Sequence, residues 1–381
     1  MPDLRHSLLA ALLAANLAAA PPEDARALML QARALQIRGG GSDPVAAAAI
    51  YRRVATLVPG SAEVHLRLSE ALQEAQDPQG ALAPARKAVA LAPRNAEARA
   101  HLGLLLYQLF QKDEALAPEA ARELRTAAAL LPQDPELWAR LGEVSERRKD
   151  GEGALNAWLH LGRLRPSFLG AWERAVIHAR ALQNYEGRRE SVLALNARNP
   201  DERHLRMLEE LARDQIQAGY LAHAEESFLL LARHLPQEPG LWENVALVRI
   251  QTSRFEEALD SLKRAEALKV TPRTAFNTAR ALMNLGRFQE AETRLAGLLA
   301  GKIQDDLIAD GAPALYAETL LLEGKGGALL AFLKEHPGRP QVAGELQVFT
   351  CQAPISRNDC HSALAALKEG TASSPTLPLF T

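Results

Sequence analysis

Apolar residues along this chain recur at helical spacing, in pairs of patterns that a short polar break separates. In residues 134–166 (DPELWARLGEVSERRKDGEGALNAWLHLGRLRP), Trp138 and Leu141 lie on one face of a first pattern. Trp158 and Leu161 lie on one face of a second pattern, after a break that contains two glycines. The stretch therefore predicts two amphipathic helices joined by a short turn.

Prolines close these pairs of helical patterns at nearly constant spacing. In steps of 34, 39, 34, 34 and 36 residues, they stand at Pro59, Pro93, Pro132, Pro166, Pro200 and Pro236. A period near 34 residues with two helices per unit is typical of a helical solenoid, in which each repeat packs only on its neighbours. The chain is therefore predicted to be all-α, with about nine to ten repeats.

The repeat pattern resembles that of the tetratricopeptide repeat family. That family places Trp, Leu and Gly on a first helix and Ala, an aromatic residue and Ala on a second, followed by Pro. Residues 134–166 match the pattern almost completely, and other units match it in part. The resemblance implies a right-handed α-solenoid of helix-turn-helix tetratricopeptide-like repeats. It also implies a protein-binding role without catalysis, although the fold alone does not name the partner.

The period divides the chain into four parts after its first residues. A main array of about eight repeats is expected over 23–300, and an irregular insertion over 301–311 is expected to separate two sub-arrays. Looser helical repeats are expected over 312–369. The Ser/Thr/Pro-rich residues 370–381 are predicted to be disordered.

Local signals refine the helix boundaries inside the main array. Asp43 is predicted to cap a helix that starts at Pro44. The third repeat is five residues longer than the norm, and we place the surplus in residues 111–117, with Pro118 restarting the helix. The sixth repeat gains two residues, which we place near residues 219–223.

Residues 1–20 are the part of the sequence that indicates the cellular compartment of the protein. They carry Arg5, an apolar run over 8–15 and three alanines at 18–20, which together resemble a secretory signal peptide. The alternative is an ordinary first helix, because the leucines also form a helical stripe. A cleaved signal would make the protein periplasmic or secreted, and an uncut one would leave it cytoplasmic. The run is too short to span a bilayer, and no later segment is apolar enough, so no stable membrane span is expected.

Charge and motifs narrow the classes of function. The chain has 381 residues, 48% of them hydrophobic, and a formal net charge of −2, whereas a general nucleic-acid surface would be strongly basic. The ten histidines form no HExxH motif, and no GxxxxGK[ST] phosphate loop occurs. We therefore expect no catalytic residue, no cofactor, no metal and no nucleic-acid partner.

The two cysteines of the chain, Cys351 and Cys360, lie nine residues apart near its end. The turn between two expected helices could bring them within bridging distance, so a disulfide is predicted in an oxidising compartment. Two unrelated thiols are the alternative. A metal site is not expected, because His361 is adjacent but no second histidine stands at ligand spacing.

The resemblance also implies where a partner would bind, since first helices line the concave groove in this family. Transferring the groove positions gives Tyr107 and Ile177, and it gives the following candidate partner-binding residues: Glu143, Glu146, Glu173, Arg180, Met207, Leu211, Glu243, Asn244, Leu247, Arg273, Phe276, Asn277 and Arg280. Three of them, Asn244, Arg273 and Asn277, correspond to part of a clamp with which some family members grip a peptide's terminal carboxylate. The clamp is incomplete, because Met207 and Leu211 occupy its first two positions.

The character of these groove positions changes along the array. The stretch from Glu136 to Glu173 is acidic, and that from Met207 to Met283 is more apolar, so a protein or peptide with a basic part and an apolar part would complement it. The leading hypothesis is a scaffold or adaptor in envelope assembly or biogenesis. The alternatives are a cytoplasmic adaptor of a regulatory or secretion complex and an accessory protein that binds glycan or cell-wall polymer. The oligomeric state is left open.

Overall fold

The computed structural model describes residues 23–37, 43–301, 303 and 305–335. Every regular element in these residues is a helix, which confirms the predicted all-α class. The chain divides into two compact units, Met1–Arg198 and Asn199–Thr381, and each is described here by itself. They are called unit 1 and unit 2 below.

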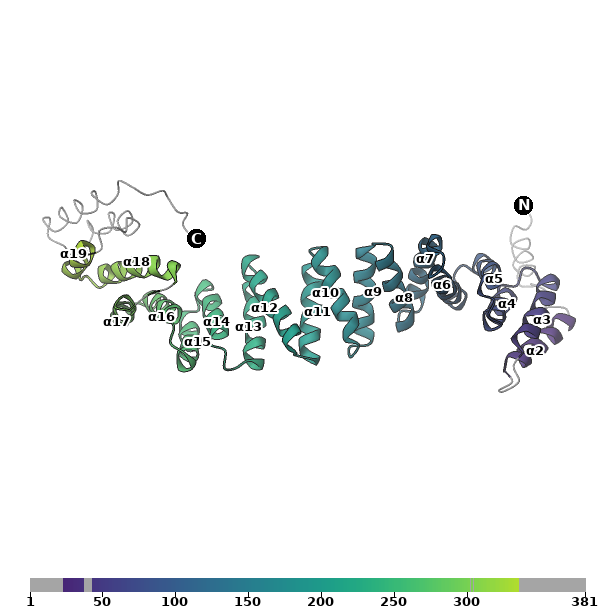
Figure 1. The fold of residues 1–381 in the computed structure, drawn as a ribbon, viewed down its shortest axis with the longest axis horizontal. Coiled ribbons are helices and arrows are strands. Elements are labelled where there is room, and N and C mark those ends of the chain that lie inside the picture. Colours follow the sequence, from purple (N-terminus) through teal and green to yellow (C-terminus); the bar gives the residue numbers. More distant parts are fainter. Residues whose placement is uncertain (1–22, 38–42, 302, 304, 336–381) are drawn as a thin grey trace, which may run out of the picture. The chain divides into compact units, whose positions relative to one another are not determined.

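Unit 1 contains ten described α-helices and one short 3-10 helix, arranged as successive antiparallel pairs (Figure 1). In chain order they are α2 (Glu23–Ile37), α3 (Pro44–Leu57), α4 (Ala62–Glu74), α5 (Pro78–Leu91), α6 (Ala96–Phe110), η1 (Glu114–Leu116), α7 (Ala117–Leu130), α8 (Pro135–Arg147), α9 (Gly151–Leu164), α10 (Leu169–Ala181) and α11 (Tyr185–Arg198).

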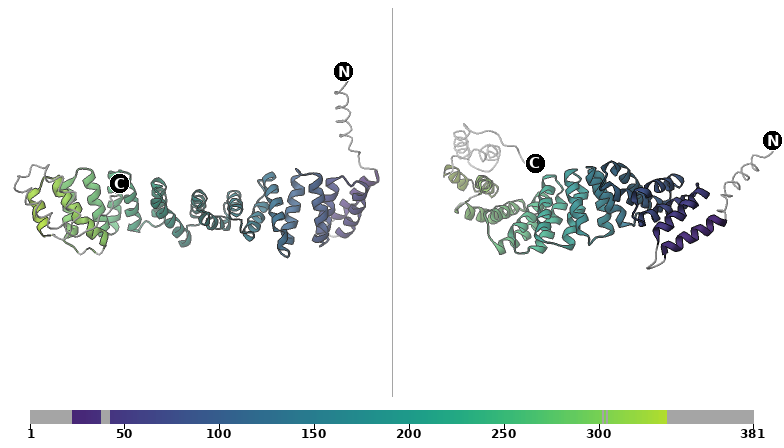
Figure 2. Two further views of the ribbon diagram at one scale, coloured as in Figure 1. Left: turned by 90° about the horizontal axis from the view of Figure 1, so that it is seen from above. Right: turned by 45° about the vertical axis from the view of Figure 1, so that its right-hand side comes forward.

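Unit 2 continues the same plan with eight described α-helices, which Figure 2 shows from two further directions. They are α12 (Glu202–Gln217), α13 (Leu221–His234), α14 (Pro239–Gln251), α15 (Phe255–Leu268), α16 (Pro272–Asn284), α17 (Phe288–Leu299), α18 (Asp306–Leu322) and α19 (Gly326–Glu335). Within the described residues of either unit, none of these helices is both long and apolar enough to cross a membrane.

Short polar side chains start most of these helices. Asp43 accepts a hydrogen bond from the backbone nitrogen of Ala46 at 2.9 Å, with Pro44 at the first helical position, which confirms the predicted start of α3. The same capping contact is made by Ser61, Asp77, Asn95, Asp134, Asp150, Asp201, Thr271 and Asp305. Each cap satisfies a backbone N–H that the first helical turn leaves unpaired.

Seven hairpin turns in the described residues share one geometry. Three residues join the two helices, and the middle one has a positive φ of 53–79°. The next residue then donates its backbone N–H to a carbonyl five residues earlier, at 2.8–2.9 Å, as Asp150 does to Ser145. This is the pattern of a Schellman cap. A single turn design therefore sets the angle between the paired helices of these seven hairpins.

Small residues let the paired helices approach closely. At Gly142 in α8, an added Cβ would stand 2.7 Å from the ring of Trp158 in α9. At Gly162 in α9, it would stand 2.7 Å from the ring of Trp172 in α10. Both indoles are buried, at 2% and 3% exposed, as predicted for core positions. Alanine and leucine fill most of the remaining core of each unit.

Three predicted boundaries change or sharpen in the structure. The surplus of the third repeat was predicted in residues 111–117, with the helix restarting at Pro118; the structure places η1 at Glu114–Leu116 and starts α7 at Ala117. The placement near residues 219–223 was wrong, because the turn there keeps its three residues and the extra length extends α12 to 16 residues, against 13 in α10 and α14.

The prediction of an irregular insertion over 301–311 was also wrong in its extent. Asp305 caps α18 with bonds from the backbone nitrogens of Leu307 and Ile308, and the helix runs through Pro313 to Leu322. The division into compact units lies at residues 198 and 199 rather than in this segment. The expected signal peptide, the cysteine pair and the C-terminal tail lie outside the described residues.

Candidate functional site

First helices of neighbouring repeats are joined by side-chain hydrogen bonds across one face of unit 1, here called the inner face. Gln36 of α2 donates to Glu74 of α4 at 3.1 Å, and Gln73 of α4 donates to Gln108 of α6 at 2.9 Å. Tyr107 of α6 donates to Glu143 of α8. These contacts tie each first helix to the next independently of the hydrophobic core.

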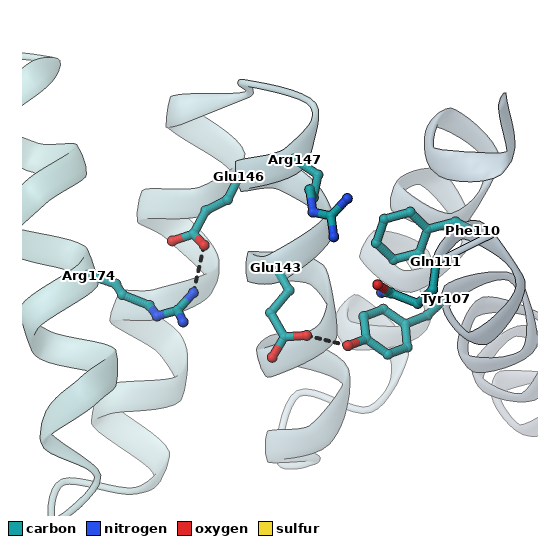
Figure 3. A pocket seen from close by; sticks show the side chains of 7 residues that line it. All are labelled: Tyr107, Phe110, Gln111, Glu143, Glu146, Arg147 and Arg174. Atoms are coloured by element: carbon teal, nitrogen blue, oxygen red, sulfur yellow. Dashed lines mark hydrogen bonds and ion pairs between the residues drawn. The ribbon is translucent and has the colours of Figure 1, made fainter. Parts of the chain in front are cut away.

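The inner face is hollowed between α6, α8 and α10. The cavity has a volume of about 350 Å³. Its lining consists of Tyr107, Phe110, Gln111, Glu143, Glu146, Arg147 and Arg174 (Figure 3). Since residues three and four apart share a helix face, α6 contributes Tyr107 and Phe110 together, and α8 contributes Glu143, Glu146 and Arg147. The cavity is therefore a product of the repeat register.

One wall of the cavity is a bonded cluster around Tyr107. Its hydroxyl donates to Glu143, and Figure 3 shows the two side chains pointing toward each other across the gap between α6 and α8. The guanidinium of Arg140 lies 4.7 Å from the ring centroid of Tyr107 and 3.5 Å from the Glu143 carboxylate. Burial raises the pKa of Tyr107, and the bond to Glu143 adds to this, so the phenol remains the donor at neutral pH.

The Glu146 carboxylate is held from three sides. It accepts hydrogen bonds from Nε1 of Trp158 at 2.9 Å and from the guanidinium of Arg174 at 2.6 Å. Nε2 of His178 lies 3.0 Å from the same carboxylate. Arg174 also lies 4.7 Å above the Trp158 ring. Glu146 therefore anchors a buried indole, a structural role as well as a place in the cavity wall.

The remaining rim is rich in donors. The guanidinium of Arg147 lies 5.9 Å from the ring centroid of Phe110. The same guanidinium lies 3.5 Å from the carboxylate of Glu114. Both of these charged side chains are largely exposed, at 57% and 85%, so the pair contributes little. Two carboxylates and two guanidiniums line the cavity, and its charges balance.

Of the residues predicted for the groove in unit 1, Glu143 and Glu146 line the cavity, and Glu173 and Arg180 do not. The latter two lie farther along or around α10, half-buried and exposed respectively. The acidic character expected from Glu136 to Glu173 is offset, since Arg140 and Arg174 pair with the two cavity carboxylates. Arg140 precedes Glu143 by three residues on α8, whereas Arg174 reaches Glu146 from the next repeat, a contact that the sequence pattern did not show.

Several groove predictions in unit 2 were wrong because the side chains are buried. Leu211 is 1% exposed, and Glu243 and Asn277 are each 5% exposed. Glu243 accepts a hydrogen bond from the Thr271 hydroxyl at 2.7 Å. A partner therefore cannot reach these three side chains without displacing the packing around them.

The other predicted residues of unit 2 keep some exposure. Asn244 accepts a bond from Arg273 at 3.0 Å, so two members of the expected clamp bind each other. Phe276 packs beside α18, where an added Cβ on Gly311 would stand 3.2 Å from its ring. Met207 and Leu247 are half-buried, and Arg280 is exposed. The contacts described for these residues do not bring them together into one binding site.

Four cavity residues were absent from the predicted groove set: Phe110, Gln111, Arg147 and Arg174. The available signal was helical spacing. Phe110 and Gln111 follow Tyr107 by three and four residues, and Arg147 follows Glu143 by four. The predicted groove set used the same fixed positions in every first helix, and it therefore missed residues three or four positions away that share the helix face.

The geometry of the hairpins decides the fold. Paired helices of 10 to 17 residues and a shared three-residue turn recur in both units, and close glycine-to-tryptophan approaches join helices of unit 1. This is the tetratricopeptide repeat fold. No family model matches the chain, and no curated protein matches it.

Solved structures with some similarity share the helical repeat and have low identity. MamA from Desulfovibrio magneticus RS-1 is 18% identical, covering 51% of this chain and 99% of that chain, with a TM-score of 0.37. PilF from Pseudomonas aeruginosa is 22% identical over 56% and 93%, with a TM-score of 0.33. A tetratricopeptide repeat protein from Parabacteroides merdae is 15% identical over 68% and 98%, with a TM-score of 0.29. The tetratricopeptide assignment therefore stands on the hairpin geometry.

Proposed function

We propose that this protein is a non-catalytic scaffold that binds a protein or peptide segment on the inner face of unit 1. The observation that carries the proposal is the cavity between α6, α8 and α10. Its walls are held by bonds between repeats, so the site is organised before a partner arrives, which limits the entropy lost on binding. A volume of about 350 Å³ suits one or two side chains of a longer segment.

The chemistry of the described residues supports binding rather than a reaction. The titratable groups of the cavity are the Tyr107 phenol, two carboxylates paired with arginines, and the arginines themselves, and no histidine or thiol lines it. Across the described residues, no group of three or more His, Cys, Asp or Glu side chains could hold a metal ion. Ring and guanidinium surfaces are groups that protein interfaces use preferentially.

We further propose that the scaffold works in the periplasm or outside the cell, in envelope assembly. The support is the signal-like pattern of residues 1–20 in the sequence. A cytoplasmic adaptor is the competing proposal. N-terminal sequencing of the protein from its native cell separates them, since a mature form beginning near residue 20 agrees with export and an intact Met1 contradicts it.

Site-specific photo-crosslinking in the native cell tests the binding site. A photoreactive phenylalanine analogue replaces Gln111 in the cavity, and in a matched variant it replaces Lys87, which is exposed on α5 outside the cavity. The proposal expects a discrete protein adduct from position 111 and none of that mass from position 87. Equal adducts from both positions, or none from position 111, would refute the inner-face site.

A further inference from the structure

We infer that the cavity of unit 1 receives an acidic side chain that stands beside an apolar residue within a continuous peptide segment. This inference rests on the proposed function and specifies the chemistry of the partner. It reverses the sequence-based expectation of a basic partner, because the structure shows which charges of the site are already paired.

The acceptor groups of the cavity are largely occupied. Both carboxylate oxygens of Glu146 receive donors, from Trp158 and His178 on one and from Arg174 on the other. Oε2 of Glu143 accepts from Tyr107 and lies 3.5 Å from Arg140, and Oε1 of Glu143 is the one oxygen of the two cavity carboxylates without a donor among the described residues. A basic side chain of a partner would have to compete with these built-in cations, so the two glutamates offer it little.

The donor groups of the cavity keep spare capacity. A guanidinium carries five N–H donors, whereas Arg174 spends one nitrogen on Glu146, and Arg147 has a marginal contact of 3.5 Å with Glu114. In the part of the chain that the structure describes, the side-chain amide of Gln111 makes no hydrogen bond. Carboxylates match this set best, since guanidinium-to-carboxylate bonds are charge-assisted and can be bidentate.

Apolar surface lies beside these donors. The rings of Tyr107 and Phe110 pack with centroids 5.4 Å apart at the cavity, and Arg147 lies over the second ring. Ile177 follows Arg174 by three residues on the exposed side of α10 and is 59% exposed. A residue with an apolar side chain next to the acidic one would cover this surface.

The site favours an internal segment over a chain end. Hydrogen-bonding groups continue on the α4 side of the cavity, at Gln73 and Gln108, and apolar surface continues on the α10 side at Ile177. A segment that crosses the inner face would contact both sides, whereas a terminus that ends in the cavity would contact one. We therefore assign the carboxylate to an aspartate or glutamate side chain.

Peptide arrays test the inference with the full-length protein. Three libraries of acetylated and amidated nonapeptides combine Leu, Phe, Ser and Gly with Glu, with Gln or with Lys, so they differ in the charged position alone. We expect the Glu library to bind at least about ten times more tightly than the Gln library, and the Lys library to bind most weakly. Parallel peptides with a free carboxyl terminus and Gln in place of Glu report whether a chain end can substitute.

Matched variants place the effect in the cavity. Arg147→Gln should weaken binding of Glu peptides about tenfold and leave Gln peptides unchanged. Arg148→Gln, the same change at the exposed neighbouring position outside the cavity, should have no effect on either. Tighter binding of Lys peptides, tighter binding of the free-terminus peptides, or equal weakening of all libraries by Arg147→Gln would overturn the inference and leave the proposed function intact. Absence of binding by all three libraries would overturn both.

Discussion

The inner face of unit 1 and the corresponding face of unit 2 follow the same repeat register, but the first contains a cavity and the second is filled by packed side chains. Between α6 and α8 the face is hollow, and its side chains bond across the gap from Tyr107 to Glu143. Between α16 and α18 it is filled. Phe276 packs beside Gly311, and the Thr319 hydroxyl, which donates to the Leu315 carbonyl at 2.7 Å, lies 3.0 Å from the sulfur of Met283.

The difference shows that register places a residue on a face without deciding whether that face can receive a partner. Small residues in α18, at Gly311 and Ala312, allow the helix to approach α16 closely, and Ala312 is fully buried. In unit 1, long polar side chains occupy the equivalent space and hold the helices apart by bonding end to end. A cavity therefore forms where long polar side chains make the contact between neighbouring first helices.

The largest expected effect on stability comes from replacing Glu146, which lines the cavity of unit 1. Glu146→Arg should lower the free energy of unfolding by about 3 kcal/mol, because it leaves the buried indole N–H of Trp158 without its acceptor and adds a cation beside Arg174. Glu143→Arg should cost about 1 kcal/mol, since its partner Tyr107 is half-buried. Urea denaturation followed by circular dichroism compares the two. Equal midpoints would contradict the structural role of Glu146.

Opening the filled face should cost about 2 kcal/mol. Phe276→Ala removes a half-buried ring from the contact with α18, so the expected loss is smaller than for a fully buried phenylalanine. Hydrogen exchange should speed up in α16 and α18 and stay unchanged in α6 and α8. Tyr107→Ala is the counterpart in unit 1, where the expected result is weaker partner binding with a loss of about 1 kcal/mol. A larger loss for Tyr107→Ala than for Phe276→Ala would remove the distinction between the faces.

Acid should weaken unit 1 through His101 of α6. Burial lowers its pKa from 6.5 to about 4, and Nε2 lies 2.8 Å from the Ser69 hydroxyl, which donates to the carbonyl of Ala81. His101 therefore becomes protonated below pH 6.5 in the unfolded chain, but only near pH 4 in the folded chain. Stability present above pH 6.5 is lost as the pH falls toward 4, by about 1–2 kcal/mol after allowance for partial exposure.

The variant His101→Gln checks this assignment. Gln keeps a donor for Ser69 and does not titrate, so its unfolding free energy should change less than that of the unaltered protein between pH 6.5 and 4. Parallel curves for the two proteins over this interval would show that other groups carry the pH dependence.

The smallest expected effect concerns the turns. The positive-φ position is Gln76, Lys149 or Gln183 in unit 1, whereas three of the four such turns in unit 2 use glycine. Lys149→Gly should raise the free energy of unfolding by about 0.5 kcal/mol, because a side chain with φ of 58° is strained. Arg148→Gly, at an ordinary φ of −77°, should lower it by a similar amount. Thermal melts of both variants provide the measurement, and a loss for both would contradict the turn argument.

Much of the fold could be read from the sequence because it depends on local signals. Asp43 before Pro44 marked a helix start, and the glycine and tryptophan positions of residues 134–166 marked a close helix pair. The boundary of α18 could not be read in this way. Its glycine and proline suggested a break, but Asp305 and the packing of Ala312 against α16 outweigh that local preference.

The candidate site was predicted only in part. Register located Glu143, Glu146 and Tyr107 on the inner face, and it also selected Leu211 and Asn277, which packing buries. The compensation of Glu146 could not be predicted, because Arg174 stands 28 residues away and meets it only when two repeats stack, whereas Arg140 pairs with Glu143 at helical spacing. Contacts between repeats thus decide both which groove positions are exposed and what charge they present.

The uniform turn of the seven hairpins has a consequence for how such a chain can change over time. Each hairpin closes through its own backbone bond and contacts chiefly its neighbours, so a whole hairpin can be duplicated or deleted with only two new junctions to fit. The cross-helix bonds of the inner face are the part that does not transfer, since each needs a specific pair of repeats. Gene-level duplication would therefore lengthen the array readily, while each functional hollow would have to be built anew at a single junction.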